Sequence, residues 1–238
     1  MKNMTSMKLI LIFIVLYLLI VSGFFYCYPQ WDIKISSFFW DKSHFIYLSQ
    51  PWVNWVNGIR KFLNILIWLV GIFVFIGLIF SFIFKKFKKN KKLKSIFFYL
   101  LICIILGPGL LVNWGLKNHW GQPRPVQIQQ FSGDLSYQKD WVVSKQCPTN
   151  CAFVCGDCAG AFIFMAFVPL LRSRKKIMWT SGIFIILFSG LIGLIRLGQG
   201  GHFISDILLA YGIDSLVIWG AYRYLISPSV FLIQSEKK

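Results

Sequence analysis

Three ionisable side chains stand close together between two strongly apolar segments in the C-terminal part of the sequence. In the stretch IRLGQGGHFISD they are Arg196, His202 and Asp206, and three glycines separate the arginine from the histidine. His202 and Asp206 are four residues apart, which places them on one face of a helix. The carboxylate could therefore hold one ring nitrogen of the histidine and leave the other free for nucleophilic attack.

Two further polar stretches carry complementary chemistry. KNHWGQPRP contains Lys117 and Arg124, and CAFVCGDCAG places Asp157 directly after Gly156. With Arg196, the lysine and the arginine make three cations that could surround a phosphate dianion, and each arginine can bind two of its oxygens. A glycine lets backbone amides approach the anion, and a helix beginning near Asp157 would add its N-terminal N–H groups. The pattern predicts a phosphate site with a nucleophilic histidine.

The elements that must position these residues are membrane helices. Hydrophobic residues make up 57% of the 238-residue chain and charged residues 14%, against about 25% charged in a soluble domain. Apolar segments of spanning or nearly spanning length cover roughly 9–28, 62–84, 95–114, 158–171, 177–195 and 203–222. The first run ends in aromatic residues without a small-residue cleavage site, which favours an uncleaved helix. The sequence therefore predicts an all-α integral membrane protein, a six-transmembrane-helix bundle forming one domain over 1–238.

The basic residues predict how the bundle is oriented. Segment 85–94 contains seven lysines and segment 172–176 four basic residues, and such loops remain on the cytoplasmic side. With six spans, both termini, including Lys237 and Lys238, lie on that side as well. The formal net charge of +17 is then a topology signal and a match to anionic membrane lipids, and no nucleic-acid partner is expected.

The external connections are predicted to be 29–61, 115–157 and 196–202. The first, aromatic and mildly amphipathic from Phe38 to Phe62, is typical of an interfacial helix in the headgroup region or of a plain aromatic belt. This topology brings the three groups of chemically active residues to one face, at the outer ends of spans three to six.

Two of the three motifs closely resemble those of the type-2 phosphatidic acid phosphatase (PAP2) superfamily. Lys117 is followed after six residues by Arg124-Pro125, and Arg196 after five by His202, with Asp206 a further four positions on. The middle motif departs from the family pattern, because Val154-Cys155-Gly156-Asp157 stands where the family has Pro-Ser-Gly-His. The sequence around these motifs, over roughly 95–222, is similar to that of a bacterial branch of the family that includes lipid A phosphatases.

The resemblance implies a role for each matching position. The side chains of Lys117, Arg124 and Arg196 would bind the phosphoryl group, and Cys155 and Gly156 would lend backbone amides. His202 would attack phosphorus and form a phosphohistidine, and Asp206 would orient it. Asp157 inherits the place of the general acid, with His119 as an alternative acid. The family needs no metal, and no cofactor is expected.

Four clustered cysteines allow three interpretations. Cys147, Cys151, Cys155 and Cys158 follow one another at short spacing. A disulfide between Cys147 and Cys151 suits an oxidising external compartment. A zinc site would need two CxxC pairs, and the cluster offers one. A thiol nucleophile at Cys155 would need an arginine six positions later, where Ala161 stands.

The sequence thus predicts a metal-independent lipid phosphatase of a bacterial inner membrane, with its active site facing the periplasm. Lipid A is the favoured substrate, as a step in lipopolysaccharide modification, ahead of phosphatidylglycerol phosphate, phosphatidate and undecaprenyl pyrophosphate. A non-catalytic phospholipid-binding or transport protein is the alternative from another class. Neither the oligomeric state nor the phosphate removed can be predicted.

Overall fold

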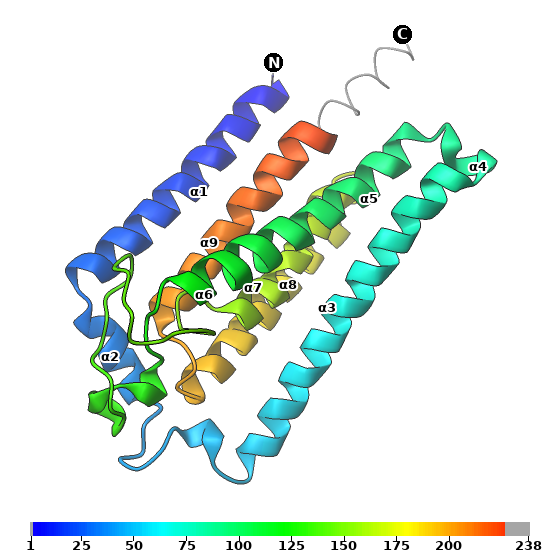
Figure 1. The fold of residues 1–238 in the computed structure, drawn as a ribbon. Helices are drawn as coiled ribbons and strands as arrows, with labels where there is room; N and C mark the ends of the chain where they lie inside the picture. Colours follow the sequence, from blue (N-terminus) through cyan, green and yellow to red (C-terminus); the bar gives the residue numbers. More distant parts are fainter. Residues whose placement is uncertain (1, 227–238) are drawn as a thin grey trace.

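A computed structural model describes residues 2–226, and this part of the chain is helical, with two isolated β-bridges and no sheet (Figure 1). Lys237 and Lys238 lie outside the described residues. Helices long and apolar enough to cross a membrane cover Ser6–Cys27, Trp52–Ile83, Lys91–His119, Lys175–Gly198 and Ile204–Ile226, and a shorter apolar helix covers Gly156–Leu171. The prediction of an all-α membrane bundle is confirmed.

The elements follow the apolar pattern of the sequence. In chain order they are α1 (Lys2–Cys27), α2 (Gln30–Ser37), η1 (Ile46–Leu48), α3 (Trp52–Ile83), α4 (Lys85–Lys88), α5 (Lys91–Ile104), η2 (Ile105–Leu116), α6 (Lys117–His119), η3 (Pro125–Gln127), η4 (Gln129–Phe131), α7 (Gly156–Phe162), η5 (Ile163–Leu171), α8 (Lys175–Gly198), α9 (Ile204–Ala221) and η6 (Tyr222–Ile226). Helix α5 continues through the π-helical η2 and α6 as one span, and α7 continues as η5.

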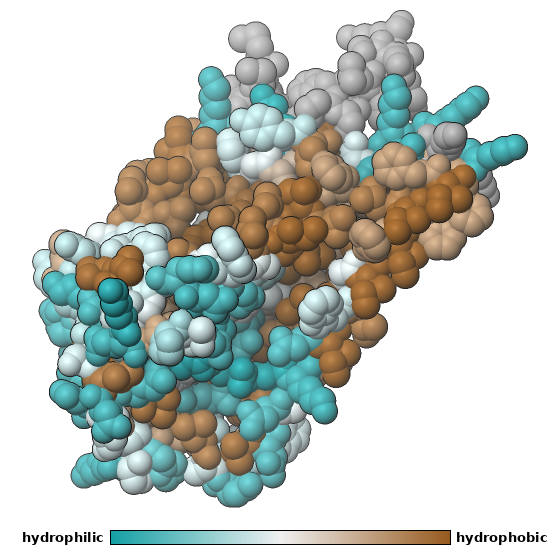
Figure 2. Space-filling model, viewed as in Figure 1, coloured by the Kyte–Doolittle hydropathy of each residue, from teal (hydrophilic) through white to brown (hydrophobic). Residues whose placement is uncertain are grey.

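Helix α9 lies at the centre of the bundle. It packs against α1, α7 and η2, and α3 packs against α5 and α7 (Figure 1). The Tyr17 hydroxyl of α1 donates to the Leu208 carbonyl of α9 at 3.0 Å, which ties these helices across the apolar interior. Large apolar side chains on the outer surfaces of α1, α3 and α8 remain exposed. Those of α1 and α3 contribute to the hydrophobic belt on the face shown in Figure 2, which suits contact with lipid tails.

The first external connection differs from the prediction. Helix α3 begins at Trp52, well before the expected span at 62, so the second half of the predicted interfacial helix belongs to this long span. The short helix of this connection is α2 instead, and it packs against α9. The polar residues of 52–61, most of which are exposed, hid the true start of the helix, because a hydropathy pattern detects only the apolar part of a helix.

The two ends of the bundle carry different features. Helix α4 and the start of α1 lie at one end, and α2 lies with the long loop 120–155 at the other (Figure 1). Helix α8 runs from basic residues at its start to Arg196 in its last turn. The chemically active residues therefore lie at the end opposite the lysine-rich segment 85–94.

Candidate active site

His202 lies at the centre of the outer end, in the turn between α8 and α9, and is completely buried. Burial and the positive charges of Arg196, Lys117 and Arg124, in that order, hold the pKa of its imidazole well below the usual value. The three cations predicted from separate motifs therefore all lie close enough for their charges to act on this one histidine. A neutral imidazole is the form that can act as a nucleophile.

The hydrogen bonds of His202 define which ring nitrogen is free. Its Nδ1 lies 2.7 Å from the Ala152 carbonyl oxygen, and this acceptor requires the proton to be on Nδ1. Asp206 Oδ2 lies 3.6 Å from the same nitrogen, beyond hydrogen-bond distance. Nε2 is buried and has no hydrogen-bond partner among the described residues. The backbone carbonyl, which the sequence analysis did not identify, holds the ring more closely than the predicted aspartate.

Asp206 has a second task at the start of α9. Its Oδ2 accepts a hydrogen bond from the Phe203 N–H at 2.9 Å, so the side chain caps the helix. Its backbone carbonyl accepts from the Cys155 N–H at 3.2 Å. The residue thereby connects the histidine turn to the middle motif.

Arg196 is held in a buried position beside the histidine turn. Its guanidinium donates to the side chain of Gln199, whose amide donates to Asn57 Oδ1 at 3.3 Å. A Cβ added to Gly201 would overlap the guanidinium. A side chain at this position would have to displace the guanidinium, because the arginine lies directly against the backbone.

Lys117 and Arg124 reach the site from the other side. A Cβ on Gly156 would lie 3.3 Å from Lys117 Nζ and would overlap Asn113 Oδ1, so this glycine brings the backbone close to the ammonium group. Arg124 donates from Nε and Nη2 to the Asn150 carbonyl at 3.2 and 2.7 Å. Burial comes first among the causes that lower the pKa of its guanidinium.

Asp157 lies between two arginines. Its Oδ2 is 2.8 Å from Arg60 Nε and 3.3 Å from Arg196 Nε. Sequence reasoning missed Arg60, which was assigned to an interfacial segment. A signal was present, because Asn57, Arg60 and Asn64 recur at helical spacing in an otherwise apolar segment. Nearby cations favour the ionised carboxylate in the empty site.

His119 does not join this group. Its Nδ1 lies 2.9 Å from the carbonyl oxygens of Trp114 and Gly115, and its ring packs edge-on against the Trp114 indole. The side chain is exposed, and its described contacts are all with the end of its own helix. This geometry favours an interfacial role over that of an alternative acid.

The cysteine cluster forms two disulfides. Cys147 is joined to Cys151, and Cys155 to Cys158. The first pair is the one that the sequence analysis favoured, and the second was missed because sequence spacing does not determine connectivity. A disulfide sulfur is not a thiolate, so the interpretation of Cys155 as a nucleophile does not fit this structure. Its backbone N–H is bonded to Asp206, so that amide does not point freely at a ligand.

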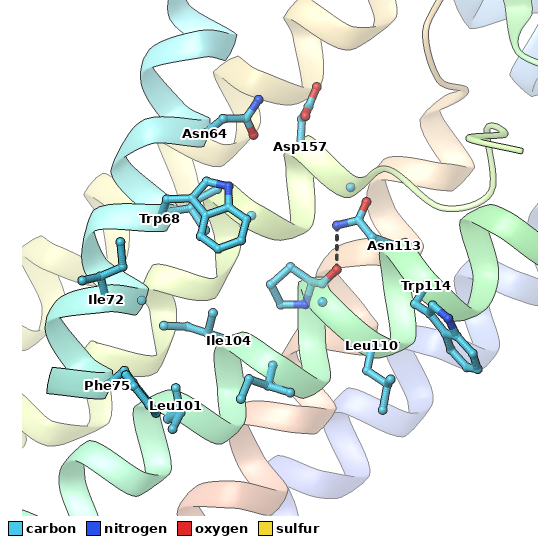
Figure 3. A pocket seen from close by; sticks show the side chains of 17 residues that line it. Asn64, Trp68, Ile72, Phe75, Leu101, Ile104, Leu110, Asn113, Trp114 and Asp157 are labelled. Atoms are coloured by element: carbon cyan, nitrogen blue, oxygen red, sulfur yellow. Dashed lines mark hydrogen bonds between the residues drawn. The ribbon is translucent and has the colours of Figure 1, made fainter. Parts of the chain in front are cut away.

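A groove leads from the lipid-facing surface to the site. It has a volume of about 700 Å³ and lies between α3, the α5–η2 span and α7. Figure 3 shows Asn64, Asn113 and Asp157 near one end, and Ile72, Phe75 and Leu101 toward the other. The Asn113 amide donates to the Pro108 carbonyl at 2.7 Å. The groove is thus polar beside Asp157 and apolar where it meets the hydrophobic belt.

These features define a polytopic membrane protein with a buried histidine in a cationic pocket beside a lipid-accessible groove. The PAP2 superfamily profile matches residues 96–227. A lipid A 4'-phosphatase from Francisella tularensis subsp. novicida (strain U112) is 36% identical over 217 residues, covering 90% of this chain and 91% of that protein. A lipid A 4'-phosphatase from Rhizobium leguminosarum is 36% identical over 121 residues, 50% of this chain and 49% of that protein.

Among solved structures, a transmembrane PAP2-type phosphatidylglycerolphosphate phosphatase from Bacillus subtilis aligns with a TM-score of 0.48 and 17% identity, covering 90% of this chain and 94% of that one. The chain belongs to the PAP2 superfamily. It is a multi-pass membrane phosphatase, a phosphoric monoester hydrolase.

Proposed function

We propose that this protein removes the 4'-phosphate of lipid A. The observation that carries the proposal is the buried Nε2 of His202, which has no hydrogen-bond partner among the described residues and lies within electrostatic range of Arg196, Lys117 and Arg124. Several buried polar atoms lack a partner among the described residues, and this one belongs to a neutral imidazole close to three cations, as a nucleophile that attacks phosphate would. The similarity to the Francisella lipid A 4'-phosphatase, which extends over nearly the whole chain, supports the choice of substrate.

In the proposed reaction, Lys117, Arg124 and Arg196 bind the phosphoryl oxygens and neutralise their charge. Nε2 of His202 attacks phosphorus, the bond from phosphorus to the sugar oxygen breaks, and a phosphohistidine forms. The Ala152 carbonyl and Asp206 stabilise the imidazolium that results. Asp157 donates the proton that the leaving alkoxide takes up, and then accepts a proton from the water that hydrolyses the phosphohistidine.

The groove supports a lipid as the substrate. Its apolar end opens between α3 and the α5–η2 span, where acyl chains could remain in contact with the bilayer, and its polar end reaches Gly156 and Asp157. A lipid could thus present its phosphate without leaving the membrane. A soluble phosphate ester would gain no binding free energy from the apolar part of the groove.

The proposed location is a bacterial inner membrane with the site facing the periplasm. The lysine-rich segment 85–94 supports this orientation, since such loops remain cytoplasmic, and the site lies at the other end of the bundle. Two disulfides near the site suit an oxidising compartment.

The test is phosphate release by the purified protein in detergent with lipid A, phosphatidylglycerol phosphate, phosphatidate and undecaprenyl pyrophosphate offered in parallel. The product of lipid A is examined by mass spectrometry. We expect loss of one phosphate from the 4'-position. Faster phosphate release from another lipid would overturn the assignment of lipid A as the substrate. Binding of the lipids without phosphate release from any of them would favour a non-catalytic phospholipid-binding protein.

A further inference from the structure

Arg60 on α3 contacts the active site from outside the three sequence motifs. Its Nε lies 2.8 Å from Asp157 Oδ2, the same oxygen that lies 3.3 Å from Arg196 Nε. Its side chain is 31% exposed, whereas that of Arg196 is 3% exposed. One arginine is therefore fixed in the interior, and the other has room to change partners.

The charge of Arg60 belongs to the phosphate-binding cluster. After burial, it is the largest cause that lowers the pKa of the Arg124 guanidinium. Two neighbouring guanidinium groups repel each other, and an anion between them relieves the repulsion. In the empty site Asp157 is an anion of this kind, and a bound phosphate would be a stronger one.

Arg60 also lies over the polar end of the groove. Arg60, Asn64 and Trp68 follow each other at intervals of four residues, so they share one face of α3. Asn64 and Trp68 line the groove together with Asp157 (Figure 3). A headgroup that arrives along the groove therefore meets the Arg60 side chain at its polar end.

We propose that Arg60 is a fourth phosphate-binding residue, which pairs with Asp157 in the empty site and transfers to a phosphate oxygen when the substrate binds. This inference rests on the proposed phosphatase function. Guanidinium groups bind carboxylates and phosphates with the same two-point geometry, so the exchange conserves the hydrogen bonds of the arginine. The transfer leaves Asp157 with one cation fewer beside a phosphate dianion, which favours proton uptake by its carboxylate.

The experiment measures binding of inorganic phosphate to the purified protein by isothermal titration calorimetry, alongside lipid turnover. We expect Arg60→Gln to weaken phosphate binding at least about tenfold, because a charge-assisted hydrogen bond is lost. It should raise KM more than it lowers kcat. Arg60→Lys should recover part of the affinity. Lys61→Gln, at the adjacent exposed position of the same helix, serves as the matched control and should change neither quantity.

A second variant tests the exchange itself. Asp157→Asn removes the carboxylate that competes for Arg60, so it should tighten phosphate binding several-fold in the wild-type background. In the Arg60→Gln background the same change should have much less effect. Equal effects in the two backgrounds would mean that Asp157 and phosphate do not share Arg60.

A purely structural role of Arg60 predicts a different result. Arg60→Gln would then lower the thermal midpoint and leave the phosphate affinity of the folded protein unchanged, and this outcome would overturn the inference. Failure of the proposed function is distinguishable, because it appears as absent lipid turnover in the wild type, whether or not phosphate binding depends on Arg60.

Discussion

The His202 ring has its two nitrogens in opposite situations. Nδ1 is held by the Ala152 carbonyl at 2.7 Å, while Nε2 is buried without a partner among the described residues. An unsatisfied buried polar atom costs on the order of 1–3 kcal/mol. Such a cost is typical of a site whose missing partner is the substrate, and the phosphorus atom would take that place.

His202→Ala is therefore expected to abolish turnover, because no phosphoenzyme can form without Nε2. Asp206→Ala should lower kcat by about 10²–10⁴-fold, because its carboxylate, 3.6 Å from Nδ1, stabilises the imidazolium and its Oδ2 caps the start of α9 beside the histidine. For both variants, the release of phosphate would be measured. The amount of acid-labile phosphohistidine trapped on the protein would be measured as well. A His202→Ala protein with near-normal turnover would show that the nucleophile is another residue.

Asp157 stands at the position where the family has a histidine, and this exchange should be visible in the pH profile. Free imidazole titrates near pH 6.5 and a free aspartic acid near pH 3.9, so an imidazole donor works closer to neutrality. We expect Asp157→His to retain more activity than Asp157→Ala and to move the optimum upward. The profile of kcat against pH is the measurement. Full activity with an unchanged profile in Asp157→Ala would remove Asp157 from the proton transfer.

At the scale of elements, α2 and the external loop hold the start of α9 through a buried carboxyl pair. Ser205 Oγ lies 2.7 Å from Asp32 Oδ2 and 3.1 Å from Asp140 Oδ1, and the Ser205 N–H donates to Asp32 Oδ1. Tyr137 and Gln122 donate to the two carboxyls. The single hydroxyl hydrogen cannot serve both acids, so one carboxyl must itself be protonated and donate to Oγ.

Burial raises the pKa of both acids, to about 8 for Asp32, where the charge of Asp140 adds to the effect, and to about 6 for Asp140. The folded protein thus keeps a proton that the unfolded chain loses near pH 4. The stability from this proton is complete below about pH 4 and is lost as pH rises through 6 to 8.

Asp140→Asn should reduce this pH dependence, because it removes one titrating carboxyl and the charge that adds to burial in raising the pKa of Asp32. Its amide can donate to Ser205 Oγ at every pH. For one proton, the wild type is expected to lose stability between pH 5 and pH 8 by at most about 1.4 kcal/mol per pH unit. The variant should lose less over the same range. Thermal midpoints in detergent across this range are the measurement, and parallel curves for the two proteins would contradict the shared proton.

At the scale of the whole molecule, the sequence predicted the apolar helices, which have a long hydrophobic pattern, and the site residues that belong to spaced motifs. The apolar runs gave the spans, and the motif spacing gave Lys117, Arg124, Arg196 and His202, which the structure brings together. Hydropathy did not give the outer part of α3, because its polar face meets the site. The Ala152 carbonyl could not be predicted, because a backbone acceptor has no residue signature and is placed by tertiary packing.

The orientation of the bundle can be tested with single cysteines in a Cys27→Ser background, since Cys27 is an exposed free thiol. Lys139→Cys, exposed in the long loop on the active-site side, should react with a membrane-impermeant maleimide in intact cells with a permeable outer membrane. Lys89→Cys, in the lysine-rich segment, should react only after the inner membrane is opened. Both positions are exposed, so a difference in labelling reports the side of the membrane.

The expected pattern follows from the lysine excess of segment 85–94, which disfavours translocation, and from its position opposite the active site (Figure 1). It would place the active-site end of the bundle at the level of the lipid headgroups of the outer leaflet of the inner membrane. Labelling of Lys89→Cys in intact cells together with protection of Lys139→Cys would place the site at the cytoplasmic face. A periplasmic lipid A phosphatase could not operate from there, so the proposed substrate would fail together with the topology.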